Sequence, residues 1–263
     1  MNKITIILAG TALLLLLCNA SGCKNKENIA QPANNVTTPA VTEVAAETAK
    51  TETPADFKSI PGSIVKINTK FGDMVVRLYD ETPKHRDNFL KLAGEKFYDG
   101  LLFHRCIPSF MIQGGDPNSR GASMNQMLGS GGPGYTVPAE FNAALIHKKG
   151  ALCAARQGDQ VNPAKASSGS QFYIASGQPW TEMQLAQNET NIALSMPGFK
   201  YTDEQKKIYQ TVGGTAQLDM NYTVFGEVIQ GLNIIDSVLA LPTQRDRPLS
   251  DVTMKVEILK KGN

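Results

Sequence analysis

The chain has few of the residues from which metal centres and nucleophile–base pairs are built. Among 263 residues there are three histidines (His85, His104 and His147), four cysteines and one tryptophan. The histidines lie far apart and lack the spacing of a zinc-binding motif. The formal net charge is only +2, without a clustered basic stripe. We therefore expect no metal, no cofactor and no nucleic-acid partner.

The sequence also lacks an apolar run of the ~20 residues that a membrane-spanning helix needs. After a short basic start, residues 4–17 form an almost unbroken apolar run that fits the core of a secretory signal. Small residues then precede Cys23, as in the bacterial lipobox, although Ala20 stands where leucine is usual. The pattern predicts a signal peptide over 1–22 and lipidation of Cys23, which would attach the protein to a bacterial membrane in the cell envelope, facing the periplasm or the cell surface. The alternative is an ordinary signal peptide with a chance cysteine.

Large apolar residues are scarce between Cys23 and Ile60, where Ala, Thr, Pro, Asn and Glu predominate. Such a segment buries too little apolar surface to offset the entropy lost on ordering. We therefore expect a lipidated N-terminus and disordered tether over 23–60, with a root-mean-square span of roughly 30–35 Å. The folded domain is expected over 61–261.

Cysteine is rare in the expected domain, which contains only Cys106 and Cys153. Two cysteines in an exported protein can form a disulfide, provided that their Cα atoms approach within about 7 Å. Otherwise they are small buried residues. The sequence leaves both possibilities open.

What the domain does contain is many short stretches of strand character separated by glycine turns. Residues 64–67 and 74–78 flank a turn at 70–73, which predicts a hairpin. Residues 222–228 and the alternating residues 252–258 also read as strands. Many short strands and few helices predict a mainly β fold, a closed β-barrel capped by helices.

Helical patterns are confined to three places. Thr82–Pro83 has the residue types of an N-cap and a first helical position, with Gly94 as the stop. Residues 232–241 have helical spacing. Residues 179–213 read as a helical insertion, in which 202–205 has the spacing of a capping box.

Five segments carry motifs that resemble one enzyme family in order and spacing. They are Phe103–Asp116 (FHRCIPSFMIQGGD), Gly129–Phe141 (GSGGPGYTVPAEF), His147–Leu152 (HKKGAL), Ser168–Ile174 (SGSQFYI) and Tyr222–Val228 (YTVFGEV). Together they resemble the cyclophilin-type peptidyl-prolyl cis-trans isomerases, here in a bacterial lipoprotein form, over about 61–261. The resemblance implies a closed antiparallel eight-stranded β-barrel capped by helices. By itself, 103–116 reads only as a strand-turn-strand.

Residues 129–134 are rich in glycine but lack the terminal Gly-Lys-Ser/Thr of a phosphate-binding loop. Pro133 also removes one backbone donor. We interpret this segment as a structural glycine turn, with a phosphate loop as the alternative.

The resemblance also implies which residues form the site. Arg105 matches the catalytic arginine of the family, and Gln113 matches the glutamine that orients it and the substrate. The implied substrate-binding residues are Phe110, Met111, Ala155, Arg156, Tyr173, Gln217, Leu218 and Tyr222.

Four of these positions depart from common members of the family. Tyr173 replaces a phenylalanine of the proline pocket, Arg156 replaces an asparagine, and Tyr222 stands where eukaryotic members have a histidine. Gln217 occupies the position of a tryptophan that helps to bind cyclosporin. The resemblance therefore implies weak sensitivity to cyclosporin with retained activity.

The implied function is an isomerase that accelerates rotation about X-Pro bonds in exported or envelope proteins and so assists their folding. Its partners would be proline-containing polypeptides, and we expect a monomer. A binding module or chaperone that uses the same groove, with residues 179–213 as a partner site, is the first alternative, and an inert lipoprotein scaffold is the second. Arg105 and Gln113 favour the enzyme, because a groove that only binds proline does not need them.

Overall fold

The computed structural model describes residues 57–262. The predicted signal peptide (1–22), the lipidation site Cys23 and most of the predicted tether (23–60) lie outside the described residues. Within 57–262, no helix has the length and apolar character needed to cross a membrane.

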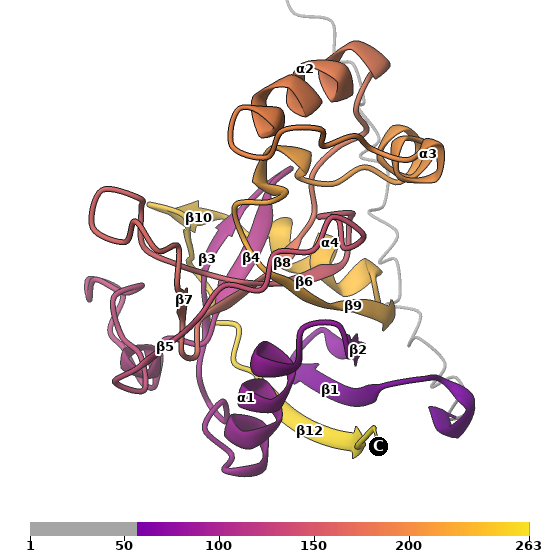
Figure 1. The fold of residues 1–263 in the computed structure, drawn as a ribbon. Coiled ribbons are helices and arrows are strands. Elements are labelled where there is room, and N and C mark those ends of the chain that lie inside the picture. The colour runs from indigo at the N-terminus through magenta and orange to yellow at the C-terminus, as the bar shows by residue number, and fades with distance from the viewer. Residues whose placement is uncertain (1–56, 263) are drawn as a thin grey trace, which may run out of the picture. The chain divides into compact units, whose positions relative to one another are not determined.

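Eight strands form one antiparallel sheet in the order β12-β1-β2-β9-β6-β8-β4-β3 (Figure 1). The sheet curls into a half-barrel, which confirms the predicted eight-stranded antiparallel fold with helices. The strands are β1 (Ser63–Thr69), β2 (Gly72–Leu78), β3 (Phe103–Ile107), β4 (Met111–Gly114), β6 (Ala151–Ala154), β8 (Phe172–Ala175), β9 (Val224–Gln230) and β12 (Lys255–Lys260).

The edge strands β12 and β3 meet through the irregular segments that precede them. The N–H of Phe103 donates to the carbonyl of Val252 at 2.9 Å. The N–H of Met254 donates to the carbonyl of Leu101 at 2.8 Å, and Gly100 donates to Met254 at 2.9 Å. Backbone hydrogen bonds therefore bridge the seam of the sheet without a continuous strand ladder.

Smaller elements lie between the main strands. Two short ladders pair β5 with β7 and β10 with β11. The bounds of these elements and of three single 3-10 turns are β5 (Thr136–Val137), β7 (Ser167–Ser168), β10 (Thr243–Gln244), β11 (Arg247–Pro248), η1 (Phe57–Ser59), η2 (Pro117–Ser119) and η3 (Ala216–Leu218).

Two helices pack against the sheet and complete its inner core. The first, α1 (Pro83–Gly94), contacts β12 and β9, and the other, α4 (Asn233–Leu239), contacts β2, β3 and β4. Phe89 on α1 and both Ile235 and Val238 on α4 join the inner core. Each helix therefore contributes its apolar face to the interior of the half-barrel.

The start of α1 differs in one respect from the prediction. The helix begins and ends at the predicted residues, but the side chain of Thr82 makes no capping hydrogen bond. Instead, the carboxylate of Glu140 accepts hydrogen bonds from the N–H groups of Lys84 and His85, at 3.1 and 3.0 Å. A carboxylate from a distant loop therefore satisfies the first turn, where the helix dipole favours negative charge.

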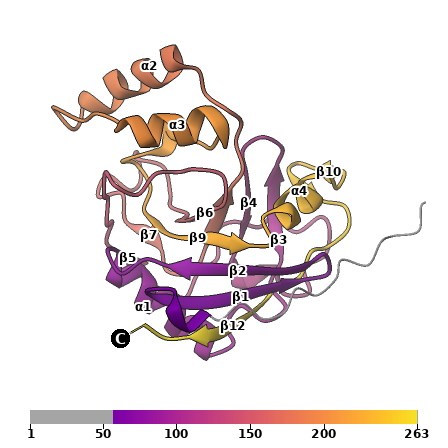
Figure 2. The ribbon, with the colours of Figure 1, turned by 90° about the vertical axis from the view of Figure 1, so that its right-hand side faces the viewer.

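Residues 179–213 form the expected helical insertion. It contains α2 (Glu182–Ala193) and α3 (Asp203–Thr211), which lie together on one side of the half-barrel (Figure 1, Figure 2). The insertion packs against the rest of the domain through a small apolar cluster, the insertion core, in which Leu185, Ile192, Phe199, Tyr201 and Tyr209 meet Ile146, Ala216 and Met220 from outside the segment.

Local signals explain where the two helices of the insertion begin. Thr181 and Gln184 form a capping box at the start of α2, and Thr202 forms the predicted capping box with Gln205 at the start of α3. Each box satisfies two backbone donors that the first helical turn leaves free.

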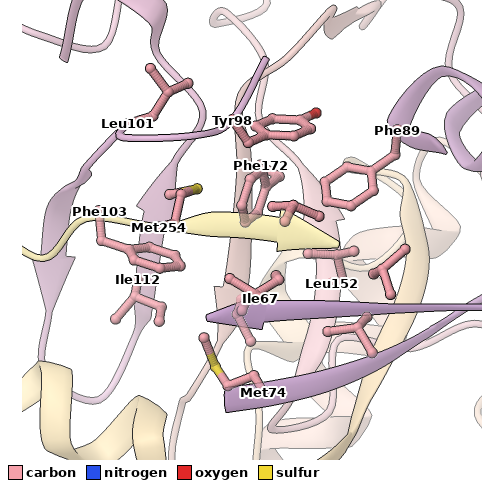
Figure 3. Close-up of a cluster of buried hydrophobic side chains, with 14 of the residues drawn as sticks. Ile67, Met74, Phe89, Tyr98, Leu101, Phe103, Ile112, Leu152, Phe172 and Met254 are labelled. Atoms are coloured by element: carbon pink, nitrogen blue, oxygen red, sulfur yellow. The ribbon is translucent and has the colours of Figure 1, made fainter. Parts of the chain in front are cut away.

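The strands of the sheet turn alternate side chains to opposite faces. On β8, Phe172 and Ile174 belong to the inner core, whereas Tyr173 and Ala175 belong to a second apolar cluster on the outer face. Figure 3 shows the inner core, where Phe89 meets the ring of Phe172 edge-on at 5.5 Å between centroids. Both faces of β8 are buried, and its outer face carries the candidate site.

Candidate active site

Nine of the ten predicted site residues line one small cavity on the outer face of the sheet. They are Arg105, Phe110, Met111, Gln113, Ala155, Arg156, Tyr173, Leu218 and Tyr222. The cavity has a volume of about 150 Å³, roughly that of five water molecules. The tenth residue, Gln217, is exposed on η3 and does not line it. The cavity is therefore built on strands whose opposite faces form the inner core.

The pairing of β3 with β4 places Arg105 opposite Gln113. Nη1 of Arg105 donates to Oε1 of Gln113 at 3.4 Å, and Nε lies 3.4 Å from Oδ2 of Asp246. The amide of Gln113 is held in turn, because its Nε2 donates to Oε1 of Gln171 at 3.0 Å. The Arg105 side chain nevertheless remains 45% exposed, so its guanidinium is oriented from two sides and still accessible to a ligand.

Aromatic rings form part of the cavity wall. Tyr173 and Tyr222 meet edge-on with centroids 5.9 Å apart, and the guanidinium carbon of Arg156 lies 4.4 Å from the centroid of Tyr222. Arg156 pairs with Asp159 at 2.5 Å and donates to the carbonyl of Asn221 at 2.8 Å. Because its side chain is only 5% exposed, Arg156 holds the Tyr222 ring in place through a cation–π contact.

A buried hydrogen-bond network extends from Tyr173 away from the cavity. The Tyr173 hydroxyl lies 3.0 Å from Nε2 of His147, and Nδ1 of the same imidazole lies 2.7 Å from Oδ1 of Asp219. The His147 and Asp219 side chains are 0% and 2% exposed. The sequence alone does not reveal this network, because Asp219 lies 72 residues beyond His147 and no local spacing connects them.

The network ends in the helical insertion. The other carboxylate oxygen of Asp219 accepts hydrogen bonds from the hydroxyls of Tyr201 and Tyr209, both at 2.6 Å. Burial, and then the negative charge of Asp219, raises the pKa of both tyrosines, so both hydroxyls remain protonated donors. With the N–H and Nδ1 of His147, Asp219 has four polar partners. The cavity and the insertion are therefore joined through one buried carboxylate.

The two cysteines are free and buried. Cys106 belongs to the inner core and Cys153 to the cluster on the outer face of the sheet. Burial raises the pKa of Cys106 to about 12 and the pKa of Cys153 well above its ordinary value. Of the two possibilities that the sequence left open, the structure selects small buried residues.

The glycine-rich segment 129–134 is a structural turn. The N–H groups of Gly129 and Gly131 donate to Oδ2 of Asp116, at 2.5 and 3.3 Å. A Cβ atom on Gly131 would lie 2.1 Å from Oδ1 of the same carboxylate. These donors already serve a carboxylate of the protein, which argues against the phosphate-loop alternative.

Within residues 57–262, no group of three or more His, Cys, Asp or Glu side chains is placed to hold a metal ion.

The site thus combines a small cavity that has apolar and aromatic side chains in its wall with one oriented and accessible guanidinium, on a curled eight-stranded sheet. Residues 64–258 match the family described as cyclophilin type peptidyl-prolyl cis-trans isomerase/CLD. The chain belongs to this family and is a peptidyl-prolyl cis-trans isomerase of the cyclophilin type.

Individual relatives agree with this assignment. A putative peptidyl-prolyl cis-trans isomerase of Staphylococcus saprophyticus is 33% identical over 206 residues, covering 76% of this chain and 95% of that protein. A putative bifunctional phosphatase/peptidyl-prolyl cis-trans isomerase of Streptococcus pyogenes is 35% identical over 208 residues, which are 76% of this chain but 39% of that longer protein. The crystal structure of a cyclophilin type peptidyl-prolyl cis-trans isomerase from Cryptosporidium parvum has a TM-score of 0.53 and 25% identity, covering 76% of this chain and 98% of that chain.

Proposed function

We propose that the substrate proline binds in the 150 Å³ cavity and that Arg105 lowers the barrier to rotation of the X-Pro bond. The observation that carries this proposal is the guanidinium of Arg105, which lines a cavity with apolar and aromatic side chains in its wall, is oriented by Gln113 and Asp246 and is still partly exposed. The apolar wall binds the ring, and Gln113 positions both the guanidinium and the flanking peptide.

The chemistry needs no bond to break. The barrier to rotation about a peptide bond is ~18–20 kcal/mol, because resonance gives the C–N bond partial double-bond character. In the twisted transition state this resonance is lost and the proline nitrogen regains a lone pair. A guanidinium facing that nitrogen stabilises the transition state more than the planar ground state, which is the differential binding that catalysis requires.

The energies set what each part must contribute. Uncatalysed X-Pro exchange takes tens to hundreds of seconds, so roughly a thousand turnovers per second would require lowering the barrier by ~7 kcal/mol. A hydrogen bond to a charged group contributes ~1.5–3 kcal/mol. The remainder comes from fixing the ring in the cavity while the flanking peptide turns, and from excluding the water that favours the planar state.

Exchange spectroscopy by NMR on an Ala-Pro peptide tests the role of Arg105. We expect Arg105→Ala to reduce catalysed exchange by at least about tenfold, ~1.4 kcal/mol, with a smaller loss of peptide affinity. Arg105→Lys should also lose activity, because a point charge does not replace the fixed donor fork. Arg86→Ala is the matched control, since that surface guanidinium pairs with Asp80 and Asp87 on the outside of the domain. Wild-type exchange rates in Arg105→Ala would refute the mechanism.

The same variant separates the enzyme from a holdase that uses the groove only for binding. An isomerase should accelerate refolding of a proline-limited substrate, and Arg105→Ala should not. Suppression of aggregation that survives in Arg105→Ala, with no acceleration by either protein, would favour the binding module.

We also propose that the isomerase works outside the cytoplasm, held to a membrane by a lipid on Cys23 and acting on exported or envelope proteins. The proposal is supported by the apolar run over 4–17, the small residues before Cys23 and the polar stretch that follows it. Cys23→Ser should move the protein from the membrane fraction to the soluble fraction of cells. Cys18→Ser, inside the predicted signal, is the matched control and should leave the protein in the membrane fraction, whereas equal fractionation of all three proteins would refute the anchor.

A further inference from the structure

A second and larger cavity adjoins the proline pocket. It has a volume of about 650 Å³ and shares Arg105 and Gln113 with the proline pocket. One wall comes from the loop that contains Met124 and Met127, and another from the turn between β10 and β11. A peptide bound in the proline pocket therefore has room beyond Arg105 for a neighbouring side chain.

The loop that forms the first wall is fixed by Arg247. Nη1 of Arg247 donates to the carbonyl of Ser123 at 2.6 Å, and Nη2 donates to the carbonyl of Ala122 at 2.9 Å. Nη2 also pairs with Asp251 at 3.1 Å. These bonds tie the loop to β11, so the cavity has a built wall on this side.

The charged groups of the lining have one sign. Arg105, Arg245 and Arg247 line the cavity, and no described lining residue is acidic. Asp246 and Asp251 pair with Arg105 and Arg247, respectively. Arg245 is exposed at the turn and has no ion-pair partner among residues 57–262, so its charge is available to a ligand.

From this geometry we infer that the cavity is a subsite for the carboxylate of an aspartate or glutamate that lies close to the proline in the bound polypeptide. Arg245 supplies the uncompensated charge, and Arg105 and Arg247 keep the rest of the lining positive. Met124 and Met127 lie beside the apolar stem of the acidic side chain. The inference rests on the proposed function, because it assumes that the substrate proline occupies the adjoining pocket.

Paired peptides test the subsite. Each peptide contains one Ala-Pro, and each flanking position in turn carries either Glu or Gln, which differ in charge but hardly in size. We expect kcat/KM for the Glu peptide to exceed that for the Gln peptide by about fivefold at one position, the upper value for a partly exposed ion pair. The preference should shrink at ~0.5 M salt, where the Debye length falls to about 4 Å.

Variants at Arg245 identify the group responsible. Arg245→Gln should bring the Glu/Gln ratio close to one, and Arg245→Glu should invert it. Lys96→Gln is the matched control, because Lys96 is also an exposed cation with a positive φ, 56° against 51° for Arg245, but it does not line the cavity. Its Glu/Gln ratio should equal that of the wild type. The ratio is compared within each variant, so a general change in activity cancels.

A ratio near one at every position of the wild type, or a preference that persists in both Arg245 variants, would overturn the subsite. If the wild type isomerised none of the peptides, the proposed function would fail instead. Calorimetric binding of the same Glu and Gln peptides would still decide the subsite, since tighter binding of the Glu peptide that is lost in Arg245→Gln supports it without turnover.

Discussion

Removing the hydroxyl of Tyr209 should destabilise the whole domain and not only the helical insertion. The hydroxyl donates to the buried carboxylate of Asp219 at 2.6 Å, and the Tyr209 side chain is fully buried. A hydrogen bond to a charged group contributes ~1.5–3 kcal/mol. For a domain of this size, Tyr209→Phe should therefore lower Tm by roughly 3–12 °C.

The same variant tests whether the insertion and the proline pocket are coupled. Tyr173 and Tyr209 lie at opposite ends of the hydrogen-bond network that runs through His147 and Asp219. Residues in one hydrogen-bond network show coupling energies of about 0.5–3 kcal/mol. We therefore expect the unfolding free energies of Tyr173→Phe, Tyr209→Phe and the double variant to be non-additive by at least about 0.5 kcal/mol.

Urea titration with two probes measures this coupling. Trp180, the single tryptophan, donates to the carbonyl of Gly214 at 2.9 Å and packs with the insertion core, so its fluorescence reports on the insertion. Circular dichroism reports on the secondary structure of the whole domain. Tyr98→Phe is the matched control, because it removes a hydroxyl from a buried tyrosine of the inner core, and its effect should add to that of Tyr209→Phe. Additivity in the Tyr173 cycle, together with separate transitions for the two probes, would refute the coupling.

Two further predictions concern ionisable groups that are partly or fully buried. Burial acts to raise the pKa of Glu227, but Lys148 and Arg77 lower it more, so the net pKa is below its ordinary value. This carboxylate should stabilise the fold at pH values above its unfolded pKa of about 4.3 and lose that contribution as the pH falls through the lower folded pKa. Glu227→Gln should flatten this part of the curve of urea midpoint against pH, and an unchanged curve would contradict the prediction. The thiols of Cys106 and Cys153 should react with a disulfide reagent at pH 8 only after denaturation, because burial raises their pKa; rapid labelling of the native protein would show that the buried placement is wrong.

Sequence patterns predict the elements of this fold better than the contacts between them. The hairpin of β1 and β2 and the capping box at Thr202 are local, so residue types and spacing suffice to find them. The cap of α1 is different, because Glu140 reaches it from a distant loop while Thr82 has the right residue type and makes no capping bond. A side chain that is distant in sequence can replace a local cap, and a local pattern cannot show this.

The candidate site follows the same division. The site residues on β3, β4 and β8 were named only through the resemblance of their motifs to the family, and the period of a strand accounts for their lying on one face. Gln217 could not be placed, since its exposure depends on the conformation of η3. The hydrogen-bond network through His147 and Asp219 could not be predicted from the sequence, because it joins residues from three separated segments.

The insertion enters and leaves the domain at one point, and this has a consequence for protein engineering. Gln178 and Gly214 form a backbone bridge, with the N–H of Gly214 3.3 Å from the carbonyl of Gln178. A short linker could therefore replace the whole segment between them without moving either end. Such a minimal domain would nevertheless strip Asp219 of two phenol donors, so the shortened protein would need a compensating change such as Asp219→Asn. The segment could also be grafted into another protein, because its two ends lie side by side. The recipient would then have to supply a hydrogen-bond acceptor for the hydroxyls of Tyr201 and Tyr209.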